Sequence, residues 1–203
     1  MNAIILNGTL KPSPESSSAE ALAGVVARAL QDRGVSQVEH VRLVDHDVKP
    51  GVEADMGDGD AWPQIHDKIL AADILVVATP TWLGQISSVT KRALERMDAM
   101  LSETDDAGVP VAYNRVAGAV VVGNEDGAHA CVANIAQALI DIGFTFPGQA
   151  WTYWNKGPGP GDEVYLTSDE KEWTNSTGEA AAHNLVAVAK ALHANPIAKP
   201  PNA

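Results

Sequence analysis

Apolar and polar positions along the chain fall into blocks that predict strands and helices in turn. Continuous apolar runs of five to seven residues are typical of strands buried on both faces of a sheet, and strict alternation is typical of an edge strand. On these patterns five strands are predicted, at residues 2–6, 35–43 (alternating, hence an edge), 73–78, 116–122 and 144–150. Helical periodicity and glycine stops predict five helices, at residues 19–33, 62–71, 88–101, 128–142 and 177–193.

The regular exchange of strands and helices predicts an α/β protein with a parallel sheet. Right-handed crossovers leave two main strand orders for such a sheet, the flavodoxin-like and the Rossmann order. The length of 203 residues favours a single domain over residues 1–203, with its core at about 2–155. Residues 45–60 hold three glycines, one proline and many acids, which predicts an irregular excursion.

Composition narrows the classes of partner. The chain has 14 Lys and Arg against 26 Asp and Glu, so its formal net charge of −12 argues against general affinity for nucleic acid or anionic lipid. The single cysteine, Cys131, excludes an intrachain disulfide and a cysteine-held metal cluster, and it is expected to be a small core residue. No apolar run is long enough to span a membrane and no leader pattern opens the chain, so we expect a cytoplasmic protein.

The first candidate binding segment follows the first strand. Residues 8–18 run from a glycine through a serine-rich loop into a helix N-terminus, where free backbone N–H groups and hydroxyls favour a phosphate. Neither the Walker A nor the Rossmann glycine spacing is present. The alternative is a surface loop in which Ser18 only caps the helix. The candidate ligands here are Thr9, Lys11, Ser16, Ser17 and Ser18.

The second candidate segment follows the third strand, where open α/β sheets place their ligands. It offers an aromatic face, hydroxyls and an approachable backbone, which suit a planar heterocycle better than a metal. Its candidate residues are Pro80, Thr81, Trp82, Leu83 and Gly84. The alternative is that Trp82 belongs to the core or to a subunit interface.

The third candidate segment follows the fourth strand and consists of Gly123, Asn124, Glu125, Asp126 and Gly127. These residue types tolerate tight turns beside a ligand. The alternative is a turn in which Asp126 caps the next helix. His129, just beyond, is either a surface residue or a possible assistant in the reaction that hydrogen-bonds a heterocycle or a substrate.

No spacing of histidines and carboxylates suggests a metal site, and no Gly-x-Ser-x-Gly elbow suggests a hydrolase.

Three motifs together resemble the flavodoxin-like NADPH-dependent FMN reductases and NAD(P)H:quinone oxidoreductases. They are Leu6-Asn7-Gly8-Thr9-Leu10-Lys11 with Ser17-Ser18, Pro80-Thr81-Trp82-Leu83-Gly84-Gln85-Ile86-Ser87-Ser88 with Lys91, and Gly123-Asn124-Glu125-Asp126-Gly127-Ala128. The resemblance covers about residues 3–155. It implies a flavodoxin-like three-layer sandwich around a five-stranded parallel sheet of order 2-1-3-4-5.

The resemblance also implies FMN as cofactor and NAD(P)H as electron donor. Thr9, Ser17 and Ser18 would hold the phosphate, residues 80–84 would line the ribityl chain and one side of the ring, and residues 124–127 would contact the ring. Ala19 stands where the family often has a threonine, which removes one potential phosphate ligand. The cysteine motif of the iron–sulfur branch of the family is absent.

Residues 151–161 are predicted to form an aromatic, Gly/Pro-rich loop with three aromatic residues within four positions. This loop is either a lid or subunit contact beside the flavin, or packing for the last helix. The resemblance implies a homodimer or a homotetramer.

Three functions remain open on the sequence. The leading hypothesis is an NAD(P)H-dependent oxidoreductase that passes electrons through FMN to a flavin, a quinone or a similar small acceptor. The alternatives are an FMN-binding electron carrier, which the acidic surface fits, and a cofactor-free interaction module.

Overall fold

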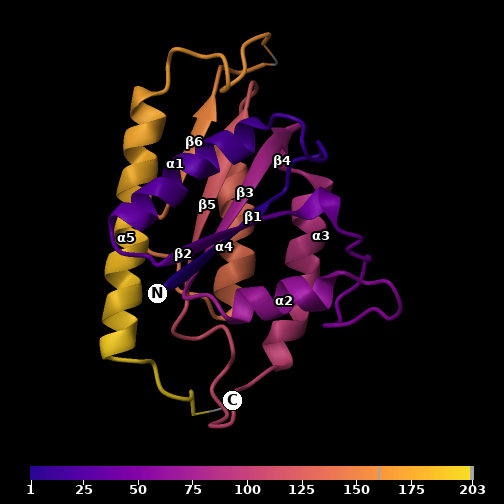
Figure 1. The fold of residues 1–203 in the computed structure, drawn as a ribbon, viewed down its shortest axis with the longest axis vertical. Coiled ribbons are helices and arrows are strands. Elements are labelled where there is room, and N and C mark those ends of the chain that lie inside the picture. Colours follow the sequence, from indigo (N-terminus) through magenta and orange to yellow (C-terminus); the bar gives the residue numbers. More distant parts are fainter. Residues whose placement is uncertain (160, 202–203) are drawn as a thin grey trace.

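A parallel sheet forms the centre of the molecule (Figure 1). The structure, a computed structural model, describes residues 1–159 and 161–201. The strands are β1 (Asn2–Asn7), β2 (Gln37–Arg42), β3 (Ile74–Trp82), β4 (Gln85–Ile86), β5 (Val116–Gly123) and β6 (Trp151–Asn155). The order β2-β1-β3-β5-β6 confirms the predicted 2-1-3-4-5 order, because β4 is only a short antiparallel partner of β3.

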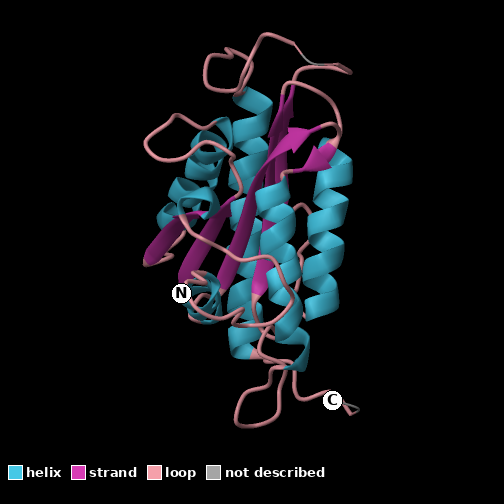
Figure 2. Ribbon diagram, turned by 90° about the vertical axis from the view of Figure 1, so that its right-hand side faces the viewer, coloured by secondary structure: helices cyan, strands magenta, loops and turns pink. Residues whose placement is uncertain are grey.

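Helices cover both faces of the sheet, as Figure 2 shows from the side. The helices are α1 (Ser18–Asp32), α2 (Trp62–Leu70), α3 (Ser88–Arg96), α4 (Ala128–Ile142) and α5 (Glu172–Ala194), with two 3₁₀ turns, η1 (Leu43–Asp45) and η2 (Met97–Ser102). Helices α1 and α5 pack on one face and α2, α3 and α4 on the other. The central strands are buried on both faces, which explains their continuous apolar runs and confirms the three-layer architecture.

Glycines end two of these helices where the sequence indicated. Gly143 has φ +115 and closes α4 beside the ring of Tyr113, and Gly34 has φ +90 just beyond α1. Such left-handed conformations suit glycine because it lacks a Cβ atom. Helix α4 therefore has the bounds that the sequence predicted, and Cys131 lies buried on it as expected.

The predicted last strand is wrong. Residues 144–150 form a turn with one isolated bridge, from Thr145 to Val116, and the fifth parallel strand is β6. Pro147 and Gly148 break the earlier segment, whereas the side chains of β6 alternate between half-buried and buried as an edge strand requires. Much of the predicted aromatic loop at 151–161 is therefore sheet. The last helix also starts earlier than predicted, at Glu172 rather than at residue 177.

Strand β3 extends beyond its predicted end at residue 78. It continues to Trp82 and turns back into β4, with Thr81 opposite Ile86 and Trp82 opposite Gln85. The second candidate segment is thus a β-hairpin and not an open loop.

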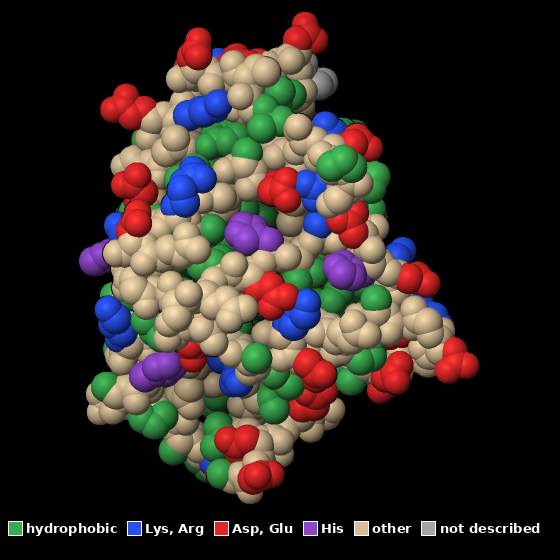
Figure 3. Space-filling model, in the orientation of Figure 1, with side chains coloured by type: hydrophobic (Ala, Val, Ile, Leu, Met, Phe, Trp, Pro, Cys, Tyr) green, Lys and Arg blue, Asp and Glu red, His purple; other side chains and the backbone are tan. Residues whose placement is uncertain are grey.

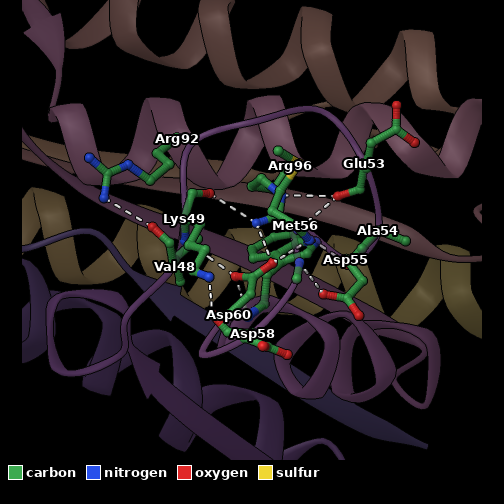
Figure 4. A network of polar contacts seen from close by, with 12 residues as sticks. Val48, Lys49, Glu53, Ala54, Asp55, Met56, Asp58, Asp60, Arg92 and Arg96 are labelled. Atoms are coloured by element: carbon green, nitrogen blue, oxygen red, sulfur yellow. Dashed lines mark hydrogen bonds and ion pairs between the residues drawn. The ribbon is translucent and has the colours of Figure 1, made fainter.

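The acidic excursion before α2 is irregular, as predicted, and it is folded around one buried cation (Figure 4). The side chain of Arg96 is fully buried and pairs with the equally buried carboxylate of Asp60 at 2.8 Å. Its guanidinium also donates to the backbone carbonyls of Lys49 at 2.9 Å and Glu53 at 2.7 Å, and it lies 5.7 Å from the centre of the Trp62 ring.

The carboxyl group of Asp60 has an unusually low pKa. Burial by itself raises that pKa, but backbone N–H donors of Met56, Trp62 and Lys49 and the guanidinium of Arg96 outweigh it and lower the value to about 2. The excursion therefore carries an ion pair that stays charged at neutral pH and whose polar groups are satisfied within the fold.

Among the described residues, no helix combines the length and the apolar character that crossing a membrane requires.

Candidate functional site

The carboxyl ends of β1, β3 and β5 meet at one edge of the sheet and border a cleft of about 200 Å³. Figure 3 shows hydrophobic side chains exposed between the loops at this end of the molecule. The cleft is lined by Thr9, Leu10, Lys11, Ser17, Ser18, Ala19, Pro80, Thr81, Trp82, Val122, Gly123, Asn124, Trp154, Val164 and Tyr165. Residues from all three candidate segments therefore converge on one space.

The predicted residues divide into two groups in the structure. Those that line the cleft are Thr9, Lys11, Ser17, Ser18, Pro80, Thr81, Trp82, Gly123 and Asn124. The other predicted ligands are not among the lining residues; they are Ser16, Leu83, Gly84, Glu125, Asp126 and Gly127. Most residues of this second group form the β3–β4 turn and the turn before α4, which support the lining.

The first segment brings hydrogen-bond donors to one end of the cleft. Ser17, rather than Ser18, is the N-cap of α1, and its hydroxyl accepts the N–H of Glu20 at 3.2 Å. The first N–H groups of a helix have no intrahelical acceptor, so those of Ser18 and Ala19 lie free beside the cleft. The carboxamide of Asn7 accepts the N–H of Thr9 at 3.1 Å and directs the chain into the loop. This end of the cleft suits an anion.

A buried hydroxyl network lies beneath that loop. Thr90 donates to the hydroxyl of Thr79 at 3.0 Å, and its oxygen lies 2.9 Å from the hydroxyl oxygen of Ser87. Ser87 donates in turn to the carbonyl of Gly8 at 2.6 Å. A Cβ atom on Gly8 would lie 1.8 Å from the Thr90 hydroxyl, so only glycine fits at this point. The network joins β1, β3 and α3 directly under the first segment.

The β3–β4 hairpin carries the aromatic side of the cleft. Its two turn residues, Leu83 with φ 53 and Gly84 with φ 74, both have left-handed backbones, as two-residue hairpins require. The side chain of Trp82 is 55% exposed and borders the cleft. Trp82 is therefore not a core residue, and its ring is free to meet a ligand.

The third segment supports this hairpin. The carboxylate of Glu125 accepts the N–H of Leu83 at 2.7 Å. Gly127 has φ +113 and approaches so closely that a Cβ atom there would lie 2.6 Å from Cα of Gly84. Gly127, rather than Asp126, is the N-cap residue of α4, and α4 has no side-chain cap. The capping role considered for Asp126 is therefore wrong.

Residues beyond β6 close the cleft on its remaining side. Asn124 donates from its side chain to the carbonyl of Gly161 and accepts the N–H of Gly161 at 3.1 Å. The buried Tyr165 donates to Asn175 at 2.7 Å, and its ring meets that of Trp154 edge-on at 6.2 Å. Burial raises the pKa of the Tyr165 phenol, which keeps it neutral.

The sequence prediction missed several lining residues. They are Leu10, Ala19, Val122, Trp154, Val164 and Tyr165. The first three adjoin predicted ligands, and Trp154 belongs to the segment predicted as an aromatic loop that is either a lid or subunit contact beside the flavin or packing for the last helix; in the structure it lies on β6. The signal for the last two is the apolar group Val164-Tyr165-Leu166 within an otherwise polar connection.

His129 does not line the cleft. It is exposed on α4, and its ring meets those of Trp151 at 5.5 Å and Tyr153 at 5.2 Å. Tyr153 also contacts the exposed Trp173 edge-on at 5.2 Å. These aromatic side chains form a cluster at the free edge of β6. The structure therefore places His129 away from a direct role in the cleft.

A second, wider groove of about 610 Å³ adjoins this cluster. Its lining includes the carboxylates of Asp169, Glu170 and Glu172. An open acidic groove repels phosphates, so the smaller cleft beside the α1 N-terminus is the better candidate for an anionic cofactor.

The described part of the chain offers no metal site and no activated cysteine nucleophile at the cleft. Within residues 1–159 and 161–201, no three His, Cys, Asp or Glu side chains are grouped to hold a metal ion. Burial raises the pKa of the Cys131 thiol, which keeps it protonated and unreactive.

The donor set of the cleft fits FMN. One end combines a helix N-terminus with hydroxyls, which suits the phosphate, and the remainder is bordered by Trp82, Val122 and Trp154, which suit a flat apolar ring. Residues that would hold the two ends of the molecule therefore face one continuous space.

Solved structures resemble this chain. The crystal structure of RosB with the bound intermediate 8-demethyl-8-formylriboflavin-5'-phosphate has a TM-score of 0.87 and 32% identity, covering 97% of this chain and 82% of that one. An apo NADH:FMN oxidoreductase, EmoB, has a TM-score of 0.63 and 17% identity, covering 96% of this chain and 91% of that one, which supports the fold alone.

Two curated relatives are similar in sequence. The 8-demethyl-8-aminoriboflavin-5'-phosphate synthase of Streptomyces davaonensis is 35% identical over 172 residues. A Mycobacterium bovis protein named divalent metal cation transporter MntH is 37% identical over 208 residues. The matches cover 79% and 98% of this chain, but the chain spans only 66% of the first relative and 30% of the second.

The family model for NADPH-dependent FMN reductases matches residues 1–158, which is most of the chain and includes all three candidate segments. The chain belongs to the NADPH-dependent FMN reductase family.

Proposed function

We propose that the cleft binds FMN and that the chain transfers electrons from NAD(P)H through this flavin to a small acceptor such as a flavin or a quinone. One observation carries the proposal. The N-terminus of the 15-residue helix α1 and a hydroxyl loop lie at one end of a cleft whose other sides carry aromatic and aliphatic side chains. A cleft with hydrogen-bond donors at one end and apolar side chains along the rest matches a phosphate joined to a flat ring.

Bound FMN would supply the hydride chemistry, and the protein would supply binding and orientation. Thr9, Ser17 and Ser18 would hold the phosphate with their hydroxyls, and the first backbone N–H groups of α1 would add to these donors. Trp82, on the β3–β4 hairpin, would contact one side of the flavin ring. The segment that contains Tyr165 would limit the access of water to the cleft. This division of labour requires no acid or base side chain in the cleft.

The relatives favour a second candidate, in which the flavin phosphate is the substrate. The names of the Streptomyces synthase and of the RosB intermediate both describe riboflavin-5'-phosphate altered at its 8-position. At 32–35% identity these proteins are similar enough for this chain to share the chemistry. In both candidates the same cleft would hold the flavin's phosphate.

An anaerobic titration tests the two candidates. The purified protein is mixed with FMN, NADPH is added, and the visible spectrum is followed before the flavin is released and its mass is measured. Bleaching on a timescale of seconds with recovery of unaltered FMN supports the reductase. Bound flavin that NADPH leaves oxidised indicates an electron carrier. The second candidate is tested in a separate aerobic incubation of protein, FMN and an amine donor, because conversion of the 8-methyl group to a formyl or amino group needs an oxidant; a flavin of changed mass supports it. No flavin binding at micromolar protein contradicts all three.

Trp82→Ala tests where the ring lies, and Trp173→Ala is its matched control. Both tryptophans are about equally exposed, at 55% and 56%, but only Trp82 lines the cleft. We expect Trp82→Ala to weaken FMN binding by roughly threefold to tenfold, the range of one aromatic contact, and Trp173→Ala to leave it unchanged. Equal affinities of the two variants in a fluorescence titration would place the ring elsewhere.

We infer a homodimer or homotetramer from the same resemblance. The half-exposed aromatic cluster at the edge of β6 is the kind of surface that subunit interfaces bury. Light scattering on the purified protein measures the oligomeric state directly.

A further inference from the structure

Arg42 has an unusual position for a charged residue. It ends the edge strand β2, opposite Asn7 of β1, yet its side chain is only 9% exposed. A buried guanidinium is costly unless its donors find acceptors. The acceptors of Arg42 therefore indicate its structural role.

The acceptors of Arg42 lie on the serine-rich loop and at the start of α1. One terminal nitrogen donates to the backbone carbonyl of Lys11 at 3.3 Å and to that of Glu15 at 2.9 Å. The other forms an ion pair with the carboxylate of Glu20. The Nε–H is buried and has no hydrogen-bond partner among the described residues. The Arg42 side chain thus connects Lys11 and Glu15, at the two ends of the outer part of the loop, to Glu20 in the first turn of α1.

Asp45 holds the same loop at its midpoint. Its carboxylate accepts the backbone N–H of Ser13 at 2.9 Å and the hydroxyl of Ser13 at 2.5 Å. Three alternate residues of the loop, at positions 11, 13 and 15, are therefore hydrogen-bonded to Arg42 or Asp45 at the end of β2. Thr9 and Ser18 line the cleft on the other side of the loop.

The ion pair with Glu20 has an electrostatic consequence. Glu20 follows Ala19, which lines the cleft, so its carboxylate lies within about one helical turn of any phosphate at the α1 N-terminus. Two anions at that distance repel each other appreciably near a protein surface. The guanidinium of Arg42 compensates the Glu20 charge without itself lining the cleft.

We propose that Arg42 is the positioning residue for the flavin's phosphate monoester: it fixes the outer part of the 8–18 loop and compensates Glu20, so that the hydroxyls and the α1 N-terminus accept the phosphate. This inference rests on the proposed binding of FMN in the cleft. It assigns Arg42 to recognition of the phosphate and not to recognition of the ring.

Riboflavin, which lacks the phosphate, separates this role from a general structural one. Binding of FMN and of riboflavin is measured by fluorescence for the wild-type protein, Arg42→Gln and a control, Arg33→Gln. Arg33 also donates to a backbone carbonyl, that of Ala29 at 2.9 Å, but lies at the far end of α1. We expect Arg42→Gln to weaken FMN binding about tenfold or more, the size of a lost charged hydrogen bond. Its riboflavin affinity, and both affinities of Arg33→Gln, should stay at wild-type values.

A double variant tests the electrostatic part. Glu20→Gln removes the carboxylate that Arg42 compensates, so Arg42→Gln/Glu20→Gln should bind FMN more tightly than Arg42→Gln alone. If Arg42→Gln does not fold by circular dichroism, Arg42→Lys is used in its place. It keeps a cation beside Glu20 but cannot reach both carbonyls and the carboxylate together, so its FMN affinity should still fall relative to its riboflavin affinity.

The possible failures are distinct. If the wild-type protein binds neither flavin, the proposed function and this inference both fail. If the wild-type protein prefers FMN to riboflavin and the Arg42 variants keep that preference, only the inference fails. If Arg42→Gln loses affinity for FMN and for riboflavin equally, the inference also fails, because such a loss indicates a purely structural residue. It fails too if the double variant binds FMN no more tightly than Arg42→Gln.

Discussion

Two irregular polar segments of this chain look alike in sequence and differ in use. Residues 8–17 and 46–61 both lack helices and strands, and both combine glycine and proline with many polar side chains. The first segment borders the cleft with its hydroxyls and leads into the free N–H groups of α1. The second directs its carbonyl groups onto the buried Arg96, as Figure 4 shows.

The difference lies in where the backbone polar groups find partners. In the excursion, Arg96 and Asp60 satisfy one another and the surrounding backbone, so little is left for a ligand. In the loop, Arg42 and Asp45 hold the outer side, so the hydroxyls of Thr9 and Ser18 and the first N–H groups of α1 stay available on the cleft side. A polar segment thus indicates a binding site only when its donors are not already used by the fold.

The largest effect is expected from Arg96→Ala. This change leaves the carboxylate of Asp60 buried without its counter-ion and removes the donors of several carbonyls. We expect the free energy of unfolding to fall by about 3–5 kcal/mol, the usual loss when one partner of a buried ion pair is removed. Urea denaturation measures it.

The same variant sharpens the contrast between the two segments. The fraction of Arg96→Ala that remains folded should bind FMN as tightly as the wild-type protein. Among the described residues, none of the hydrogen-bond or ion-pair partners of Arg96 lines the cleft. A loss of FMN affinity beyond the unfolded fraction would show that the excursion also supports the site.

Gly8→Ala is expected to act at the loop itself. Its Cβ atom would lie 1.8 Å from the Thr90 hydroxyl, so the loop must shift off the hydroxyl network. Overpacking of this kind costs roughly 1–3 kcal/mol, and the short distance favours the upper end. FMN affinity should fall together with stability, unlike in Arg96→Ala, and calorimetry with a parallel FMN titration measures both.

A second change tests the cause. Gly8→Ala/Thr90→Ala removes the hydroxyl that the new methyl group meets, so it should recover part of the stability that Gly8→Ala loses. A double variant that is less stable by the sum of both changes would place the strain elsewhere.

Acid should affect the excursion through Asp60. Its pKa is about 2 in the folded protein against an ordinary value of 3.8, so the folded state favours the charged form. The stabilisation is therefore complete above pH 3.8 and is lost as the pH falls toward 2, a contribution of about 2 kcal/mol. Urea denaturation from pH 5 to 2 measures it. Asp60→Asn should show a shallower decline over this range, and an equal decline would assign the acid sensitivity to other carboxylates.

The parts of the fold that the sequence predicted correctly depend on local patterns. The three central strands are buried on both faces, which leaves an unmistakable apolar run. Helix α4 lies between Gly127 and Gly143, whose left-handed backbones mark its ends within the sequence itself. Strand order follows from the right-handed crossovers.

The parts that were missed depend on tertiary partners. Residues 144–150 carry apolar side chains at their ends but are broken by Pro147 and Gly148, and pairing with β5 places the fifth parallel strand at β6 instead. The contribution of Tyr165 to the cleft arises from its contacts with Trp154 and Asn175, which lie far from the first binding segments in sequence. The pairing of Arg96 with Asp60 is likewise invisible to periodicity, so the excursion appeared merely irregular.

Ser17→Ala should have the smallest effect on stability and the most selective effect on binding. The hydroxyl of Ser17 caps α1 by accepting the N–H of Glu20 at 3.2 Å, and losing a cap costs about 1 kcal/mol. The same residue lines the cleft beside the expected phosphate. FMN affinity should therefore fall severalfold while riboflavin affinity stays constant, as parallel fluorescence titrations and thermal unfolding can measure. If Ser17→Ala lowers stability but leaves the affinity for FMN unchanged, the hydroxyl of Ser17 serves only the fold. The 8–17 loop would then be a structural segment like the 46–61 excursion.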